Sequence, residues 1–239
     1  QYLVLRKVPA GVYTIGAPKL NDNYDNRGKC TSHSVTMQND YYVGIFYVTR
    51  AQYQRITSPG DTPSSDTNPR NYISWNTIRG SALPAAAAGD GVLKKLSDAT
   101  GLVFDLPTES MMFVAAAARL TTPYITGDSW NGIDQYGWVS SNGSNVVHPV
   151  GLKKPNRWGF YDVVGNCWEL CRDAWNATDL AVTLPDGQTP ASVGTMRASV
   201  LGDATNHNKF QTLAYRAGRD VNGTSSSPWY AFRVSYIVK

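Results

Sequence analysis

HPVGLKKPNRWGFYDVVGNCWELCRD, at residues 148–173, is the stretch of sequence that says most about the fold. Its Trp158 and Trp168 are large apolar side chains, which a loop-rich protein must bury to hold its core together. Gly159 and Gly165 suit tight turns, because glycine adopts a positive φ angle without strain. The stretch therefore predicts irregular backbone packed around buried tryptophans.

The composition of the whole chain agrees with a loop-rich globular protein. The 239 residues include 21 Gly, 13 Pro, 7 Trp, 14 Tyr and 6 Phe, and 17% of them are charged, against roughly 25% in an average soluble chain. This composition excludes a disordered tail protein, a coiled coil and a collagen. Because no linker-like boundary divides the chain, we expect one domain over residues 1–239, large enough to fold without metals or disulfides.

Several classes of partner and anchor are also excluded. The most apolar stretches, at residues 85–88 and 114–118, are far shorter than the roughly 20 residues of a membrane span. The N-terminus lacks the basic and apolar regions of a signal peptide, which we expect to be absent or already removed. The net charge is +4, but the basic residues form no stripe of the kind that binds nucleic acid. We expect no nucleic-acid partner and no membrane span.

Regular elements are expected mainly in the first half of the chain. Alternating apolar residues predict two short strands within 2–15, joined at a Pro/Gly turn, and the residues of 35–47 have strand character. Thr49, Ser74 and Thr108 are N-cap residues before helical patterns. The alanine-rich segment 82–100 also has helical spacing. From residue 121 onward no helical pattern persists, so an irregular second half is predicted.

Short motifs follow one another in a characteristic order. They are VPAGVYTIG at 8–16, YVGIFYVTRAQY at 42–53, ISW at 73–75, LPTE at 106–109, GFYDVVGNCWEL at 159–170 and FRV at 232–234. Together they resemble the motifs of the formylglycine-generating enzyme (sulfatase-modifying factor) superfamily, over almost the whole chain. The resemblance implies an α+β, C-type-lectin-like fold with much irregular structure.

Charged residues within these motifs are expected to support the scaffold. Arg197, Arg216 and Arg233 should be half-buried, because each guanidinium has five donors that can satisfy loop carbonyls or carboxylates. Glu109 and Glu169 are their natural anionic partners.

Catalysis of the family type is not expected. Formylglycine-generating enzymes bind copper through two cysteines, and the resemblance places these in the interval 199–215, which contains no cysteine. Cys30, Cys167 and Cys171 lie elsewhere and are too few for a disulfide framework. The histidines at 33, 148 and 207 show no metal-ligand spacing. We therefore predict that the protein is not an enzyme and has no catalytic residue.

A structural cation is the one metal that the resemblance implies. Asp162, Gly165, Cys167 and Glu169 match positions that bind calcium in some family members, and hard cations prefer oxygen ligands. The alternative is a turn closed by its own hydrogen bonds. We expect no required cofactor, with a structural Ca²⁺ as the expectation to test.

The C-terminal segment 197–235 has the composition of an adaptable binding surface, rich in Tyr, Ser, Asn and Gly with occasional Trp and Arg. It resembles the variable region of diversity-generating retroelement proteins, which place mutagenised codons at the C-terminus of this scaffold. The predicted ligand-binding residues are Asp203, Thr205, Asn206, His207, Asn208, Tyr215, Arg219, Asp220, Asn222, Thr224, Ser225, Trp229 and Tyr230. Their side chains are expected to be exposed.

The resemblance implies a non-enzymatic binding protein that displays a diversified surface. Its partner would be a protein or surface ligand of a target cell, and its location a cell surface or phage particle. Three alternatives stay open on the sequence. They are a catalytically inactive paralogue with an ordinary polar surface, a divergent enzyme with a non-copper site, and a structural module of an appendage.

Overall fold

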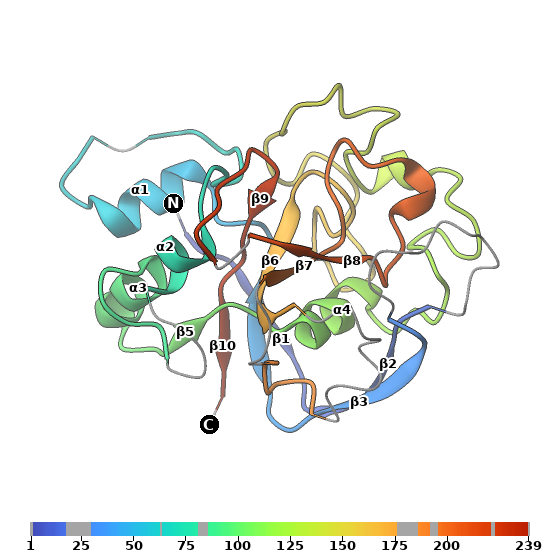
Figure 1. Ribbon diagram of the computed structural model, residues 1–239, viewed down its shortest axis with the longest axis horizontal. Coiled ribbons are helices and arrows are strands. Elements are labelled where there is room, and N and C mark those ends of the chain that lie inside the picture. Colours follow the sequence, from blue (N-terminus) through green and yellow to red (C-terminus); the bar gives the residue numbers. More distant parts are fainter. Residues whose placement is uncertain are drawn as a thin grey trace.

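Two four-stranded sheets and a hairpin organise the computed structural model of the protein (Figure 1). The structure describes residues 2–17, 30–62, 64–80, 86–175, 186–191, 196–220 and 223–238. Along the chain the elements are β1 (Leu5–Val8), β2 (Gly11–Ile15), β3 (His33–Met37), β4 (Tyr41–Gly44), α1 (Arg50–Thr57), α2 (Trp75–Arg79), α3 (Val92–Thr100), β5 (Phe104–Asp105), α4 (Glu109–Ala117), the 3-10 helix η1 (Ile133–Gln135), β6 (Trp168–Ala174), β7 (Arg197–Val200), the 3-10 helix η2 (Asn208–Phe210), β8 (Arg216–Arg219), β9 (Tyr230–Ala231) and β10 (Ser235–Ile237). The predicted α+β class is confirmed.

The first sheet joins the two ends of the chain. Its strand order is β1-β4-β10-β5, and β10 runs antiparallel to both neighbours, with Ser235 opposite Val43. Just before β10, the Phe232 carbonyl accepts a hydrogen bond of 2.9 Å from the Val48 N–H. This pairing carries Arg233 into the interior, where its exposed fraction is 0%.

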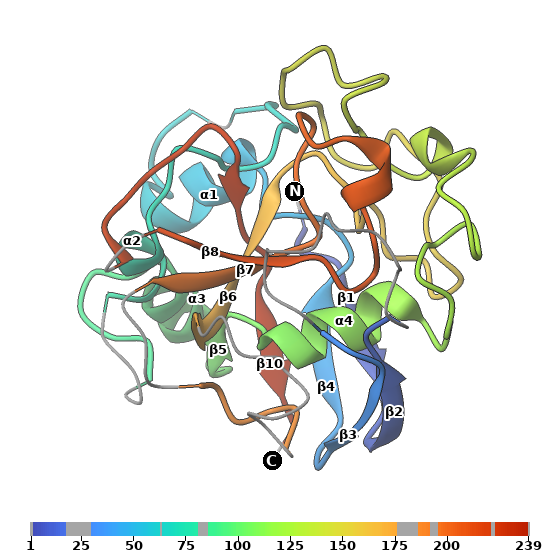
Figure 2. The ribbon, with the colours of Figure 1, turned by 45° about the vertical axis from the view of Figure 1, so that its right-hand side comes forward.

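The second sheet lies against a fully buried helix. Its strand order is β8-β7-β6-β9, with β9 parallel to β6 and the other pairs antiparallel. Helix α4 packs against β6 and β7 (Figure 2), and every one of its residues is buried. A helix that is apolar all round is stable only inside a protein. The three alanines at 115–117 leave room for neighbouring chain to approach closely.

The predicted helix starts are confirmed by their caps. The Thr49 hydroxyl accepts a hydrogen bond from the Gln52 N–H, and the Gln52 side chain accepts one from the Thr49 N–H, which completes a capping box. Ser74 caps α2 and Thr108 caps α4 through the backbone N–H three residues later. Each cap satisfies a helix N–H that would otherwise lack a partner.

The strands of the first half differ from the expected layout. Residues 35–47 contain the end of β3 and the whole of β4, and these two strands belong to different sheets. β1 and β2 likewise pair with other strands rather than with each other. The reason is a turn held by a side chain, since Asp40 Oδ1 accepts a 2.7 Å hydrogen bond from the Ala10 N–H. The chain therefore leaves one sheet at Pro9 and enters the other.

Of the two tryptophans predicted to be buried, Trp168 is fully buried, whereas Trp158 is only partly buried and packs edge-on against Tyr13 at 6.0 Å between ring centres. Trp75 is fully buried as well. Gly159 and Gly165 have φ angles of 74° and 68°, as predicted. Within the described residues, no helix is both long enough and apolar enough to cross a membrane.

Candidate binding surface

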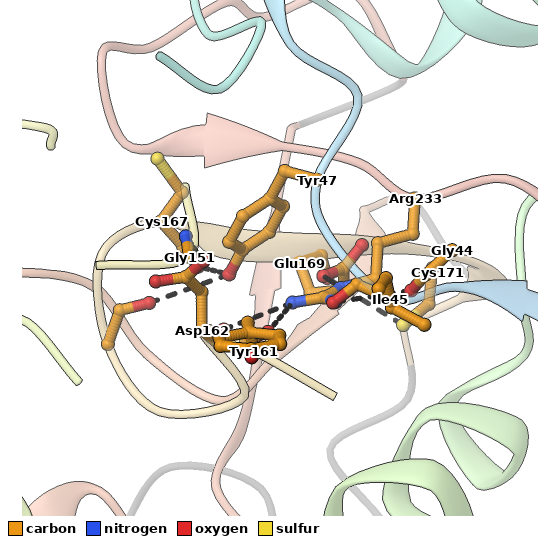
Figure 3. Close-up of polar contacts among 11 residues, drawn as sticks. Gly44, Ile45, Tyr47, Gly151, Tyr161, Asp162, Cys167, Glu169, Cys171 and Arg233 are labelled. Atoms are coloured by element: carbon orange, nitrogen blue, oxygen red, sulfur yellow. Dashed lines mark hydrogen bonds and ion pairs between the residues drawn. The ribbon is translucent and has the colours of Figure 1, made fainter. Parts of the chain in front are cut away.

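A buried ion pair fixes the junction of the two sheets (Figure 3). Arg233 Nε donates a hydrogen bond of 2.8 Å to Glu169 Oε2. Its two terminal nitrogens donate to the carbonyls of Gly44, Ile45, Tyr161 and Asp162, at 2.7 to 3.2 Å. One guanidinium thus ties β6 to the loops around residues 45 and 161. The pairing with Glu169 is confirmed, although Arg233 is completely rather than half buried.

A second ion pair lies beneath the sheet that carries the tail. Arg216 on β8 donates to both Glu109 oxygens, at 2.5 and 2.7 Å, from opposite the start of α4. Asp173 accepts hydrogen bonds from the Glu109 and Ala191 N–H groups. Burial, with a contribution from Glu109, raises the pKa of Asp173 to about 7. The side chain of Arg197 lies outside the described part of the chain.

The expected calcium ligands face other partners in the structure (Figure 3). The Tyr47 hydroxyl donates a 2.6 Å hydrogen bond to the Cys167 carbonyl and lies 3.5 Å from the Gly165 carbonyl. Glu169 is paired with Arg233, and Asp162 Oδ2 accepts from the Gly151 N–H. Among the described residues, the buried atoms Asp162 Oδ1 and Glu169 Oε1 have no hydrogen-bond partner. A cation here would compete with a tyrosine hydroxyl and a guanidinium, so these residues as arranged do not fit one.

The cysteines are placed where their chemistry is suppressed. Cys30, Cys167 and Cys171 are all buried, and none of them forms a disulfide. Burial raises the pKa of Cys167 and Cys171 well above the ordinary thiol value, so both carry a proton at neutral pH. Soft metals bind the thiolate and not the thiol. Among the described residues, no group of three or more His, Cys, Asp or Glu side chains could hold a metal ion.

The tail and Trp168 of β6 together form a row of aromatic rings with a cation at each end, which we call the cation–aromatic row. Trp168 and Tyr215 lie 4.8 Å apart between ring centres, and Tyr215 and Phe210 lie 6.2 Å apart. The Arg219 guanidinium carbon lies 4.7 Å from the Trp168 ring centre, and Lys209 Nζ lies 5.2 Å from that of Phe210. The partly buried Trp229 and Tyr230 pack against the same cluster.

The predicted ligand-binding residues divide into three groups by exposure. The exposed ones are Thr205, His207, Thr224 and Ser225, and the half-buried ones are Asn206, Asn208, Arg219, Trp229 and Tyr230. The buried ones are Asp203, Tyr215 and Asp220, at 4%, 6% and 1% exposure. Asn222 lies outside the described residues. The cluster around Trp168 brings Tyr215, Arg219, Trp229 and Tyr230 together, whereas residues 205–208 lie on a separate loop beside Ser140 and Ser141.

The expected exposure is therefore wrong for three residues, each with a structural cause. Asp203 turns inward to accept hydrogen bonds from the N–H and hydroxyl of Thr205. Tyr215 is covered by Trp168 and Phe210. Asp220 Oδ2 accepts a 2.5 Å hydrogen bond from the Trp75 N–H at the start of α2. These side chains support the surface from below.

Sequence reasoning missed three side chains of this surface. Lys209 and Phe210 lie in the tail but were outside the predicted residues, although aromatic and basic side chains are the usual anchors of interfaces. Tyr72 lies far away in the sequence, is 59% exposed and has a φ of 50°. Its N–H donates to the Ser227 carbonyl at 2.9 Å, a contact that no local pattern could have indicated.

Comparison with known proteins identifies relatives of two kinds. A formylglycine-generating enzyme from Thermomonospora curvata is 31% identical over 102 residues, which cover 41% of this chain and 33% of that protein. The match thus spans a third of the length of that relative.

Solved structures extend the likeness to the whole fold. PvdO from Pseudomonas aeruginosa superposes with a TM-score of 0.79 at 20% identity, covering 98% of this chain and 94% of that one. Treponema denticola variable protein 1 gives 0.78 at 17% identity, covering 97% and 94%. At these identities the likeness concerns the fold, which is C-type-lectin-like. The sulfatase-modifying factor enzyme 1-like domain matches residues 5–236, so the chain belongs to that family.

Proposed function

We propose that this protein is a recognition module without enzymatic activity, which binds a protein or surface ligand of a target cell through its C-terminal face. A location on a cell surface or phage particle is part of the proposal. One observation carries it: the side chains that point outward are different from those that hold the loops in place. A surface of this kind can change its contacts without changing its fold.

The first loop, residues 203–211, is held from within. The Asp203 N–H donates to Asn206 Oδ1 at 2.9 Å, and Gln211 Nε2 donates to the Asp203 carbonyl at 3.0 Å. The His207 ring is exposed, although its Nδ1 accepts a 3.2 Å hydrogen bond from the Lys209 N–H, and Asn208 Nδ2 donates to the Ser141 hydroxyl at 3.1 Å. Asn206 therefore belongs to the supporting set, whereas His207 and Asn208 are available to a partner.

The second loop, residues 220–230, is anchored to the segment before α2. Asp220 caps the Trp75 N–H, Asn71 Nδ2 donates to the Pro228 carbonyl at 2.9 Å, and the Tyr72 N–H donates to Ser227. Thr224 and Ser225 between these anchors are exposed. Pre-ordered loops lower the entropy lost on binding, and Trp, Tyr and Arg side chains supply most of the affinity in protein interfaces.

The relatives support this reading at the level of the fold. Treponema denticola variable protein 1 shares the architecture over nearly the whole chain, and its name describes a protein whose sequence varies. The buried, protonated Cys167 and Cys171 offer no thiolate for copper. A binding role therefore explains the polar and aromatic side chains of the tail better than copper-dependent oxidation does.

Two matched libraries test the proposal. The first randomises His207, Asn208, Thr224, Ser225 and Trp229, and the displayed variants are selected against several unrelated folded proteins. We expect most members to remain folded, as judged by thermal unfolding of sampled clones, and new binders to emerge.

The second library randomises the supporting residues Asp203, Asn206, Gln211 and Asp220, and we expect most of its members to unfold. If the first library unfolds as often as the second, the outward set is part of the core and the proposal fails. Failure to select any binder from a folded first library would also contradict it.

The 31% sequence identity with a formylglycine-generating enzyme over 102 residues favours one other candidate function, that of a divergent oxidase of the same family. It would convert a cysteine in a substrate peptide to an aldehyde. Incubating the protein with copper, oxygen and a cysteine peptide, then trapping aldehyde with a hydroxylamine probe, distinguishes the two. We expect no aldehyde above a copper-only control.

A further inference from the structure

We propose that Arg219 binds a carboxylate of the partner, and that the partner presents an acidic polypeptide segment to the cation–aromatic row. The inference rests on the proposed function and specifies the chemistry of its ligand. Arg219 differs from the arginines of the buried ion pairs, because they have carboxylate partners.

Most of the described arginines with little exposure pair with a carboxylate, although two of them share one. Arg79 and Arg172 pair with Asp105, Arg216 with Glu109, and Arg233 with Glu169. Arg219 is half-buried, as Arg172 is, yet no carboxylate pairs with it among the residues that the structure describes. Among the described half-buried arginines, Arg70 also has no carboxylate partner, but its terminal nitrogen donates to the Asn71 carbonyl at 3.1 Å. Its Nε is buried and has no hydrogen-bond partner there. A guanidinium that is partly removed from water without an acid is costly, unless a ligand supplies one.

The surroundings of Arg219 hold its guanidinium ready for an anion. It stacks on the Trp168 ring at 4.7 Å, and Trp168 is itself fixed by Tyr215 and by the backbone bond from its N–H to the Trp229 carbonyl. Stacking leaves the planar edge of a guanidinium free to make the two parallel hydrogen bonds that a carboxylate accepts.

The charge around the row points to the same partner. The acids in the described part of the tail are Asp203 and Asp220, and both are buried and bonded within the protein. The half-buried cations are Lys209 and Arg219, at opposite ends of the row. Trp168 and Tyr215 are buried, but the half-buried rings of Phe210, Trp229 and Tyr230 belong to the same cluster. A surface that combines two cations with these half-buried rings complements an extended segment with spaced acids and apolar or aromatic residues. A single small anion would use only one end.

A synthetic polymer tests this without knowledge of the natural partner. A random glutamate–tyrosine copolymer is titrated into the protein by calorimetry at low and high salt, with a lysine–tyrosine copolymer as the opposite charge. We expect the acidic copolymer to bind, more weakly at high salt, and the basic one not to bind. Arg219→Gln should weaken binding about tenfold or more, the usual loss for a hydrogen bond to a charged group.

Arg157→Gln is the matched control, because Arg157 is exposed on another loop and the charge change is the same; its affinity should stay within about twofold of the parent. Arg219→Lys keeps the charge and loses the planar fork, so it should bind with intermediate affinity. If Arg219→Gln has a lower melting temperature than the parent, Arg219→Lys replaces it as the test variant.

Equal binding by Arg219→Gln and the parent would overturn the proposal, as would failure of the acidic copolymer to bind. If heparin binds more tightly than the acidic copolymer, the partner is a sulfated polysaccharide and not an acidic polypeptide, and the proposal is overturned. None of these results depends on whether the tail tolerates randomisation, so they can fail while the proposed function stands.

Discussion

Replacing Arg233 with Met should nearly unfold the protein, because one side chain satisfies five acceptors in the interior. The substitution leaves Glu169 buried without its cation, and breaking a buried pair in this way costs about 3–5 kcal/mol. The carbonyls of Gly44, Ile45, Tyr161 and Asp162 also lose their donor, at about 1 kcal/mol for each hydrogen bond. These losses are not additive. We expect the free energy of unfolding to fall by at least about 4 kcal/mol, out of the roughly 5–15 kcal/mol of a typical domain.

Urea denaturation followed by tryptophan fluorescence measures this loss, with Arg157→Met as the control for an exposed arginine. The double variant Glu169→Leu/Arg233→Met separates the two causes, because it removes the buried charge and leaves only the carbonyls without donors. We expect it to recover part of the stability that Arg233→Met loses. A loss below about 1 kcal/mol in Arg233→Met would refute the reasoning, since a value that small is typical of an exposed ion pair. A double variant no more stable than the single one would show that the carbonyls, and not the charge, dominate.

Two further outcomes can be measured on the same protein. Burial raises the pKa of both Glu169 and Asp173 to about 7, above the value of about 4 expected in the unfolded chain, so the folded state binds more protons between these values. Stability should therefore fall as the pH rises from about 4 to 7, and Asp173→Asn should flatten that fall; stability that rises over this window would contradict it. EDTA should leave the melting temperature unchanged, because Tyr47 and Arg233 already bond two of the expected calcium ligands; a melting temperature that rises by several degrees with added calcium would show that an ion displaces them.

The sequence predicted the parts of the fold that depend on local chemistry. Thr49, Ser74 and Thr108 cap helices because a hydroxyl before a helix satisfies a nearby N–H. Glu109 and Glu169 were identified as partners of arginines because ordered motifs fixed their places. The pairing of strands was not accessible in this way, since the turn at Pro9 is held by Asp40, thirty residues further along the chain.

The candidate surface shows the same division. Composition predicted a binding region in the tail, yet it could not separate Asp203 and Asp220, which accept hydrogen bonds from the backbone N–H groups of Thr205 and Trp75, from Thr224 and Ser225, which are exposed. Asp, Asn and Thr have side chains that suit either role. The contribution of Tyr72 depends on a contact between segments about 150 residues apart, which only the folded chain reveals.

The buried ion pairs and the exposed loops are best understood together. Replacing a buried pair with apolar residues often costs nothing in stability, so stability alone does not account for Glu109–Arg216 and Glu169–Arg233. Both pairs make directional hydrogen bonds that fix the position of the backbone. Arg216 positions β8 over the start of α4 by bonding Glu109. Arg233 donates hydrogen bonds to four backbone carbonyls. Strand β8 ends at Arg219, and Trp168, on which Arg219 stacks, is the residue before Glu169. Both ion pairs thus set the position of the same end of the cation–aromatic row, where Arg219 stacks on Trp168. A framework that fixes the backbone by buried charges leaves its outward side chains free to vary, which is what the proposed recognition requires.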